Sequence, residues 1–204
     1  MDDLIMEIPG AATPGFCEMM IKKFEQEDRA VQPGLIGPQA EIDRTVRDSH
    51  NIEMHLLPNW NGVVDGLRKM LFSRLKTYLD EVHVGKTRSL YQNGYDGSYT
   101  MMRYDPGSVG YTWHNDFSYD NNPERPGCRT VTWLFYLNEC GGGETEFKWG
   151  RKIKPETGKL VFFPSTWCMV HRGCPVTEGQ KYLCVGWFYS TWNAGLDRMK
   201  NYYK

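Results

Sequence analysis

Two histidines and one aspartate are the residues of this sequence whose types and spacing best suit a metal ion. His114 and Asp116 lie two positions apart in a segment rich in aromatic and β-compatible residues, which predicts a strand. Side chains at positions i and i+2 of a strand share a face, so both would aim at one point, with Asn115 turned away. A third ligand, His171, would come from another strand. Two imidazoles and one carboxylate leave coordination positions open, which suits a non-haem Fe(II) oxygenase, although zinc with a bound water could use the same ligands.

A His-x-Asp tripeptide alone is common by chance. Here, however, it belongs to a series of five motifs that occur in one order. They are Tyr104-Asp-Pro-Gly with Tyr111 and His114-Asn-Asp116, then Arg129-Thr-Val-Thr-Trp-Leu-Phe-Tyr-Leu-Asn138, Gly142-Gly-Glu-Thr-Glu-Phe147, Gly158-Lys-Leu-Val-Phe-Phe-Pro164 and His171-Arg-Gly-Cys-Pro-Val-Thr-Glu-Gly-Gln-Lys181. Over residues 99–190 they resemble the prolyl 4-hydroxylase type of 2-oxoglutarate- and Fe(II)-dependent dioxygenase. The likeness is weaker before residue 99.

The resemblance implies roles for individual residues. The iron ligands would be His114, Asp116 and His171. The residues around 2-oxoglutarate would be Tyr104, Thr132, Tyr136, Lys181 and Trp187. Of these, Lys181 matches the basic residue that holds the far carboxylate, and the Tyr136 hydroxyl matches one that touches the same carboxylate. Arg129 and Tyr111 are expected beside the substrate.

The strand period agrees with the role of Lys181. In a strand over residues 181–189, Lys181, Val185 and Trp187 share one face, so the lysine would point into an apolar interior. A buried ammonium is costly without an anion beside it, and a bound dicarboxylate supplies that anion. The alternative is a surface lysine on an edge strand, which composition alone would favour.

The resemblance also implies a reaction. It is the hydroxylation of a C–H bond with Fe(II), 2-oxoglutarate and O2, releasing succinate and CO2, with ascorbate as a candidate reductant. Prolyl 4-hydroxylation of a peptide or protein is the expected form, and a free amino acid or other small molecule is the alternative substrate. Two further hypotheses are a non-enzymatic jelly-roll binding module and a zinc hydrolase, which would leave Lys181 unexplained.

Composition limits the partners and the compartment. The formal net charge is −1, so no overall field favours nucleic acid or a membrane. The six cysteines include no Cys-x-x-Cys pair, which argues against a zinc ribbon. The first residues are too short and too acidic for a signal peptide. We therefore expect a soluble, cytoplasmic protein with reduced thiols, as a monomer or weak dimer.

The elements that must position these residues are mainly β with supporting helices, an α+β arrangement. We expect one domain over residues 1–204, with residues 1–98 as a helical support and lid region and residues 99–191 as a double-stranded β-helix, or jelly-roll, core. Two N-terminal helices over residues 14–27 and 60–83 would pack on it. The predicted strands are 99–104, 111–117, 129–138, 144–148, 159–163, 168–172 and 181–191. Residues 28–57 are either a solvated loop with a strand near residues 51–56 or a lid beside the iron.

Overall fold

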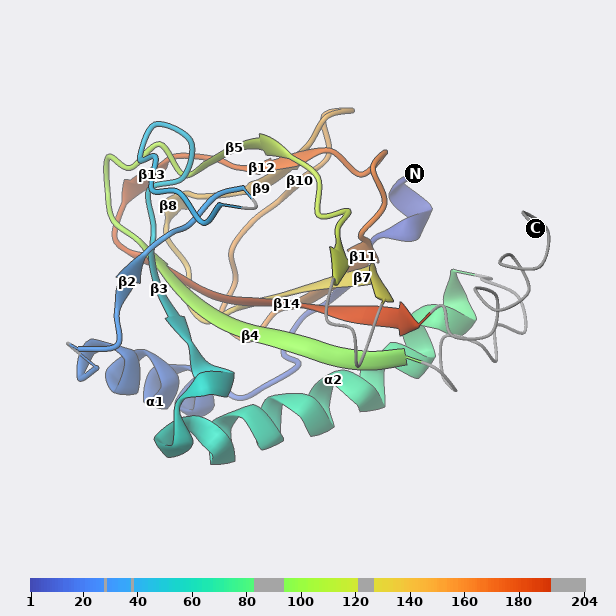
Figure 1. Cartoon of the computed structure of the whole chain (residues 1–204), viewed down its shortest axis with the longest axis horizontal. Helices are drawn as coiled ribbons and strands as arrows, with labels where there is room; N and C mark the ends of the chain where they lie inside the picture. Colours follow the sequence, from blue (N-terminus) through green and yellow to red (C-terminus); the bar gives the residue numbers. More distant parts are fainter. Residues whose placement is uncertain (28, 38, 83–93, 121–126, 192–204) are drawn as a thin grey trace, which may run out of the picture.

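Two helices cover one face of the molecule in the computed structural model, which describes residues 1–27, 29–37, 39–82, 94–120 and 127–191. Helix α1 (Pro14–Glu25) begins after Thr13, whose side-chain oxygen accepts a hydrogen bond from the Phe16 N–H at 3.3 Å. This is the cap expected of a threonine before a proline. Helix α2 (Asn61–Glu81) buries one stripe of side chains: Val63, Val64, Leu67, Leu71, Leu75, Tyr78 and Leu79. Both helices lie beneath the main sheet (Figure 1) and share a hydrophobic core with it.

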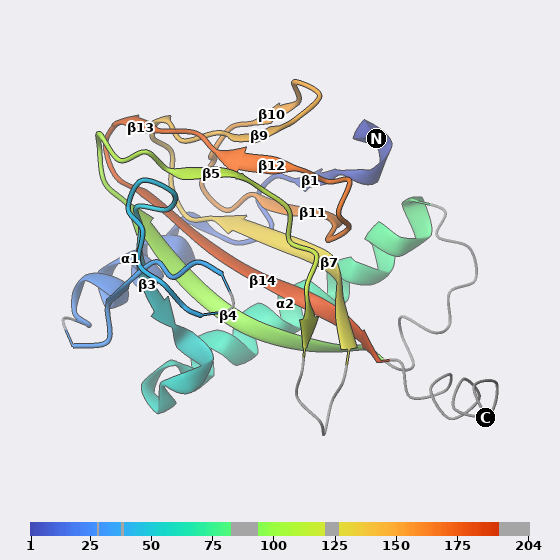
Figure 2. The ribbon, with the colours of Figure 1, turned by 45° about the horizontal axis from the view of Figure 1, so that its top comes forward.

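The main sheet has eight strands, and every pairing within it is antiparallel. Its order is β1 (Met6–Ile8), β11 (Leu160–Pro164), β7 (Gly127–Tyr136), β14 (Lys181–Thr191), β4 (Gly94–Tyr104), β3 (His50–Glu53) and β2 (Gln32–Pro33), while β6 (Tyr119–Asp120) pairs with β7. The long strands β4, β7 and β14 run side by side through its centre (Figure 2). They form the platform on which the site is built.

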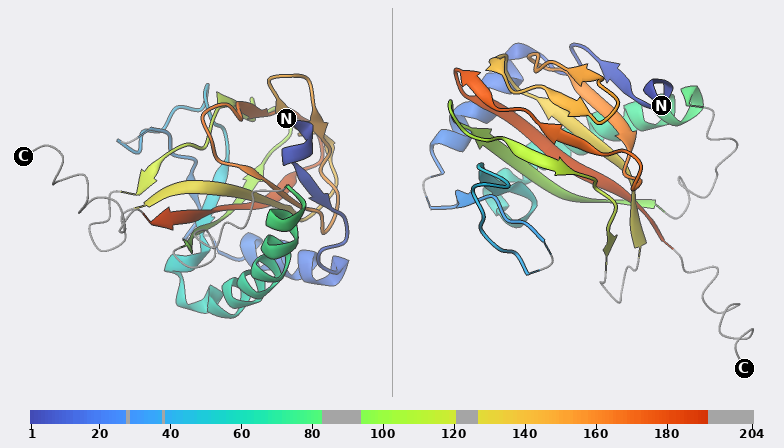
Figure 3. Two further views of the ribbon diagram at one scale, coloured as in Figure 1. Left: turned by 90° about the vertical axis from the view of Figure 1, so that its right-hand side faces the viewer. Right: turned by 90° about the horizontal axis from the view of Figure 1, so that it is seen from above.

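A second, smaller sheet faces the main one. Its order is β10 (Lys152–Ile153), β9 (Thr145–Phe147), β12 (His171–Gly173) and β5 (Tyr111–His114). A two-stranded ribbon, β8 (Gly141–Gly142) with β13 (Val176–Glu178), lies beyond it, and three short 3-10 helices span Asp2–Leu4, Met54–Leu56 and Pro58–Trp60. The two sheets are separate layers in the left view of Figure 3. The side chains between them form a second core that includes Leu134, Phe147, Val161, Phe163 and Leu183.

Strand β14 divides its side chains between the two cores, as its alternating pattern predicts. Tyr182, Cys184 and Phe188 belong to the core under the helices. Leu183 and Val185 belong to the core between the sheets. Since Lys181 is two positions before Leu183, it lies on the face between the sheets, where it is buried.

The expectation of a mostly β chain with two helices is confirmed. The expectation that both helices are N-terminal is not confirmed, because α2 begins only at residue 61, after β1, β2 and β3. Those three strands join the main sheet, so the first part of the chain extends the sheet as well as covering it. The strand expected near residues 51–56 is β3, which ends at Glu53. Among the described residues, no helix is long and apolar enough to cross a membrane.

Candidate metal centre

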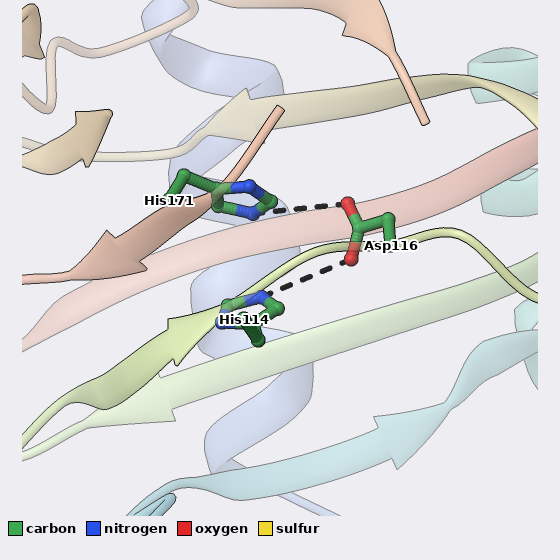
Figure 4. A group of neighbouring side chains, drawn as sticks. All are labelled: His114, Asp116 and His171. Atoms are coloured by element: carbon green, nitrogen blue, oxygen red, sulfur yellow. Dashed lines mark ion pairs between the residues drawn. The ribbon is translucent and has the colours of Figure 1, made fainter. Parts of the chain in front are cut away.

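His114, Asp116 and His171 meet at one point between the sheets (Figure 4). Each offers a ligand atom, and these atoms all lie within 4.8 Å of one another. His114 ends β5 and His171 begins β12, and the two are direct partners in the antiparallel pairing of these strands. Their rings lie 4.4 Å apart between centroids. The group therefore depends on a strand register that joins segments distant in the sequence.

The chain turns between the first two members of this group. The strand expected over residues 111–117 is too long, because β5 ends at His114. The side-chain oxygen of Asn115 then accepts a hydrogen bond from the Phe117 N–H at 3.1 Å, which forms a local turn. Asp116 is carried by this turn instead of by the strand, and it still reaches His114 and His171.

Backbone hydrogen bonds orient both imidazoles. Nδ1 of His114 lies 2.8 Å from the Thr112 carbonyl oxygen, and Nδ1 of His171 lies 2.9 Å from the Met169 carbonyl oxygen. A carbonyl only accepts, so each Nδ1 donates a hydrogen, and in a neutral ring Nε2 is then the nitrogen that offers a lone pair. The Nε2 atoms lie 3.8 Å and 3.7 Å from the two carboxylate oxygens of Asp116. Those distances are too long for hydrogen bonds but suit ligand atoms that each lie about 2.1 Å from a shared ion.

Burial and mutual charge set the protonation of the group. Burial, together with the charge of His171, lowers the pKa of His114 to about 4. Burial would raise the pKa of Asp116, but the charges of His171 and His114 and a hydrogen bond from Thr132 outweigh it and hold that pKa below its ordinary value. At neutral pH His114 is therefore neutral and Asp116 ionised, which are the states that a metal ligand needs.

Thr132 supports the carboxylate from behind. Its hydroxyl donates to Oδ2 of Asp116 at 2.8 Å and lies 2.8 Å from the Ser165 hydroxyl. Thr132 and Ser165 are fully buried, and Thr132 is not among the described residues that line the cavity beside the group. The structure thus places Thr132, expected beside 2-oxoglutarate, against Asp116.

Replacing Thr132 with valine should weaken metal binding by roughly 10–100-fold, the usual cost of losing an outer partner of a ligand. Valine keeps the shape but leaves Asp116 without this donor. The measurement is an anaerobic Fe(II) titration. Thr130→Val is the matched control, since the Thr130 hydroxyl on the same strand donates to the Phe188 carbonyl at 3.0 Å. Equal affinity in the two variants would contradict this role for Thr132.

A cavity of about 780 Å³ opens beside the three residues. Of the other residues expected in the site, it brings together Tyr104, Tyr111, Arg129, Lys181 and Trp187. Tyr136 is fully buried and is not among the described residues that line it. The Tyr136 hydroxyl instead donates to Oγ1 of Thr145 at 2.7 Å, and Thr145 lines the cavity. Thr145 was not anticipated, although it stands in the Gly-Gly-Glu-Thr motif.

Lys181 is the buried cation of this cavity. It is 3% exposed, and Nζ lies 5.6 Å from the Tyr104 ring centre and 5.4 Å from that of Tyr136. Burial lowers its pKa to about 8. No carboxylate among the described residues is paired with it. A buried ammonium in that position needs an anionic ligand to compensate its charge.

Two arginines lie on another part of the cavity wall. The Arg129 guanidinium stacks over the Trp187 ring at 3.4 Å. Arg47 lies 5.0 Å above Tyr111, which in turn stacks on His114 with 3.7 Å between ring centroids. Sequence reasoning had not placed Arg47 in the site. Its position depends on backbone pairing between residue 47 and Tyr111, which no local pattern reveals.

Comparisons with known proteins agree with this geometry. The family model described as the 2OG-Fe(II) oxygenase superfamily matches residues 99–189. A putative prolyl 4-hydroxylase of Acanthamoeba polyphaga mimivirus is 38% identical over 104 residues, which cover 43% of this chain and 43% of that protein. Prolyl 4-hydroxylase 2 of Arabidopsis thaliana is 32% identical over 130 residues, which cover 48% and 42%. The matches therefore span less than half the length of these relatives.

Solved structures share the fold over most of the chain. The viral collagen prolyl hydroxylase of Paramecium bursaria Chlorella virus-1, solved with 2OG, gives a TM-score of 0.67 at 23% identity and covers 92% of this chain and 97% of that one. A Trichoplax adhaerens prolyl hydroxylase, solved with a hypoxia inducible factor peptide, gives 0.67 at 19% identity, covering 92% and 84%. Residues 99–189, which carry all three residues of the metal group, thus match the family model of the 2OG-Fe(II) oxygenase superfamily.

Proposed function

We propose that this protein is an Fe(II)- and 2-oxoglutarate-dependent dioxygenase that hydroxylates a prolyl residue of a peptide or protein. The observation that supports this most is one cavity that combines a His-Asp-His group with a buried lysine lacking any carboxylate partner among the described residues. A divalent metal explains the first feature and a dicarboxylate explains the second.

The residues present fit both groups. Two imidazole nitrogens and one ionised carboxylate are a donor set suited to Fe(II) with open positions. In this proposal His114, Asp116 and His171 hold the metal, and Lys181 holds the far carboxylate of 2-oxoglutarate. When bound, Fe(II), 2-oxoglutarate and O2 supply the oxidation that hydroxylates the substrate and releases succinate and CO2.

The chain itself orients the reactants and excludes water. Lys181 fixes one orientation of the dicarboxylate, since a single buried cation can pair with only one of its ends. Thr145, tied to the Tyr136 hydroxyl, supplies a polar atom on the same wall. Leu134, Leu183 and Val185 also line the cavity. Their apolar side chains lower the local dielectric and strengthen the contact between Lys181 and its anion.

The proposal that the substrate is a prolyl residue rests on the similar proteins. The two curated relatives described above are named prolyl 4-hydroxylases, and the Trichoplax structure was solved with a peptide. A free amino acid remains the alternative.

We further propose that the two facing sheets are the double-stranded β-helix of this family, with residues 99–191 as the catalytic core and residues 1–98 as its support. We propose that the whole acts as a monomer or weak dimer. No disulfide joins any of the cysteines among the described residues, which supports a reducing compartment such as the cytoplasm. Ascorbate is the candidate reductant.

The first test is an anaerobic titration of Fe(II) into the metal-free protein with 2-oxoglutarate present. We expect a weak visible charge-transfer band that saturates near one iron per chain, and succinate formation that rises when proline-containing peptides and O2 are added. Folded protein that gives no band would contradict the proposal. Stoichiometric zinc with hydrolase activity would then favour the zinc enzyme instead.

A further inference from the structure

Arg47 and Arg129 are cations of the metal cavity without a carboxylate partner among the described residues. Arg47 donates from Nη1 to the Leu35 carbonyl at 3.1 Å and from Nε to the Ser49 hydroxyl at 3.2 Å. Arg129 donates weakly to the Tyr189 hydroxyl at 3.4 Å and stacks on Trp187. Neutral partners fix both guanidinium groups in place without compensating their charge, which leaves them able to pair with an anionic ligand.

Both arginines act on the region of the metal group. Arg47 lies over Tyr111, and Tyr111 lies on His114. Arg129 lies over Trp187, and both arginines line the cavity that contains the metal group. Two cations from distant parts of the chain therefore reach the same side of the site.

The charges of metal and cosubstrate do not compensate these two arginines. Asp116 is the only carboxylate among the described residues that line the cavity, which also contains the cations Arg47, Arg129 and Lys181. A divalent metal and a dicarboxylate carry equal and opposite charges, so binding both leaves the excess positive charge unchanged. A partly enclosed cavity with an excess of one sign of charge focuses its electric field and favours a ligand of the opposite charge.

A second cavity of about 560 Å³ continues from the first. The residues that line both cavities are Leu35, Arg47, Met102, Arg129 and Trp187. The second cavity runs along β3 and β4 to Asn51, Glu53 and Thr100, on the face of the main sheet beyond Met102. The two arginines therefore stand at the junction. A ligand that fills both cavities is longer than one amino acid and must pass the two arginines.

From these observations we infer that the substrate is an acidic peptide, with a carboxylate bound by Arg47 and Arg129 while the residue to be hydroxylated faces the metal group and the flanking chain enters the second cavity. This inference rests on the proposed function and names its substrate class. Arg47 lies outside residues 99–189, so this determinant comes from a part of the chain that the family model does not match.

The test compares short acetylated and amidated peptides that carry aspartate or asparagine next to a central proline. Binding is measured anaerobically by calorimetry on the protein loaded with Fe(II) and 2-oxoglutarate. We expect the aspartate peptide to bind at least about tenfold more tightly, as one charge-assisted contact implies. Raising the salt concentration should weaken binding of the aspartate peptide and leave the asparagine peptide nearly unchanged.

Arg47→Met should reduce the preference for aspartate by about tenfold, and Arg129→Met should do the same. Arg44→Met is the matched control, because Arg44 lies on the same segment, pairs with Asp48 at 2.6 Å and lines neither cavity. Arg47→Glu should transfer the preference to a peptide with lysine in place of aspartate. A peptide ending in a free proline carboxylate, compared with its amide, shows whether a terminal carboxylate can serve in place of a side chain.

The outcomes separate this inference from the proposed function. Equal binding of the aspartate, asparagine and free-carboxylate peptides, or a preference for a carboxylate that survives Arg47→Met and Arg129→Met in protein that still gives the charge-transfer band, would overturn the inference alone. Tight binding of only the free-carboxylate peptide would support it with the terminal carboxylate as the anion. Absence of the band from the unmodified protein would instead contradict the proposed function.

Discussion

Replacing His171 with alanine should lower Fe(II) affinity by more than about 100-fold and abolish turnover of 2-oxoglutarate. Loss of an outer partner alone costs roughly 10–100-fold, and here one of three ligand atoms is removed. His171 also stands directly opposite His114 in the pairing of β5 with β12, so the remaining imidazole cannot shift to replace it. The measurements are the anaerobic titration and succinate release.

The control for this variant is another histidine. His50→Ala removes an imidazole that lies 3.4 Å from Asp105 and lines neither cavity, so it should leave both readouts unchanged. Because His171 packs against Phe163 and Phe147, circular dichroism must show that the variant is folded. A folded His171→Ala protein that still turns over 2-oxoglutarate would remove His171 from the ligand set.

Replacing Lys181 with methionine should weaken 2-oxoglutarate binding and, in the ligand-free protein, stabilise the fold. Losing a charge-assisted contact of about 1.5–3 kcal/mol weakens binding by roughly 10–150-fold. The stabilisation arises because burial lowers the pKa of Lys181 from 10.5 to about 8. Protonation of Lys181 therefore costs more free energy in the folded state than in the unfolded state. This cost lowers the stability of the fold increasingly as the pH falls from about 10.5, and it is fully present below about 8.

The size and pH dependence of that gain can be measured. Each pKa unit corresponds to about 1.4 kcal/mol, so Lys181→Met should raise the free energy of unfolding at pH 7 by about 3 kcal/mol, and the gain should vanish near pH 10.5. Urea denaturation without metal or 2-oxoglutarate, at pH 7 and pH 10, gives both values. A gain that is the same at both pH values would show that methionine packing, and not the buried charge, is responsible.

Lys159 provides a control of opposite sign. It is also buried, but its ammonium contacts Glu7 at 3.0 Å and Glu156 at 2.6 Å, and hydrogen bonds to these carboxylates raise its pKa above the ordinary value against the effect of burial. Lys159→Met should therefore destabilise the protein at pH 7. The contrast separates a lysine that stabilises the fold from one that is retained for a ligand.

Local patterns were sufficient to predict much of the site and the long elements. The alternation along residues 181–191 placed Lys181 on the face between the sheets, and ordered motifs selected His114, Asp116 and His171. The strand period is a short-range property, so it placed Lys181 on the correct face. The three candidate ligands were selected by the resemblance of the ordered motifs, and the structure brings them together, while their role stays a prediction. Helix α1 was likewise predicted from a short-range pattern, since its cap and stripe are written within a dozen residues.

What could not be predicted depends on contacts between distant segments. The end of β5 at His114 is decided by the turn at Asn115 and by the pairing with β12. Arg47 enters the site because the Thr112 N–H donates to the Val46 carbonyl at 2.9 Å, which aligns the segment before β3 with β5. Thr132 was expected beside the cosubstrate because the strand that carries it was expected to line the pocket. Its hydrogen-bond partner Asp116 could be identified only from the packed structure.

The metal group and Lys181 come from opposite layers. His114 and His171 belong to the smaller sheet, whereas Lys181 begins β14 in the main sheet. A dicarboxylate that touches both the metal and Lys181 is therefore a removable cross-link between the layers, and it stabilises the folded state in proportion to the logarithm of its concentration. Since the fraction of unfolded chain determines how fast proteases remove a protein, the cellular lifetime of a protein with the proposed function would follow the supply of 2-oxoglutarate.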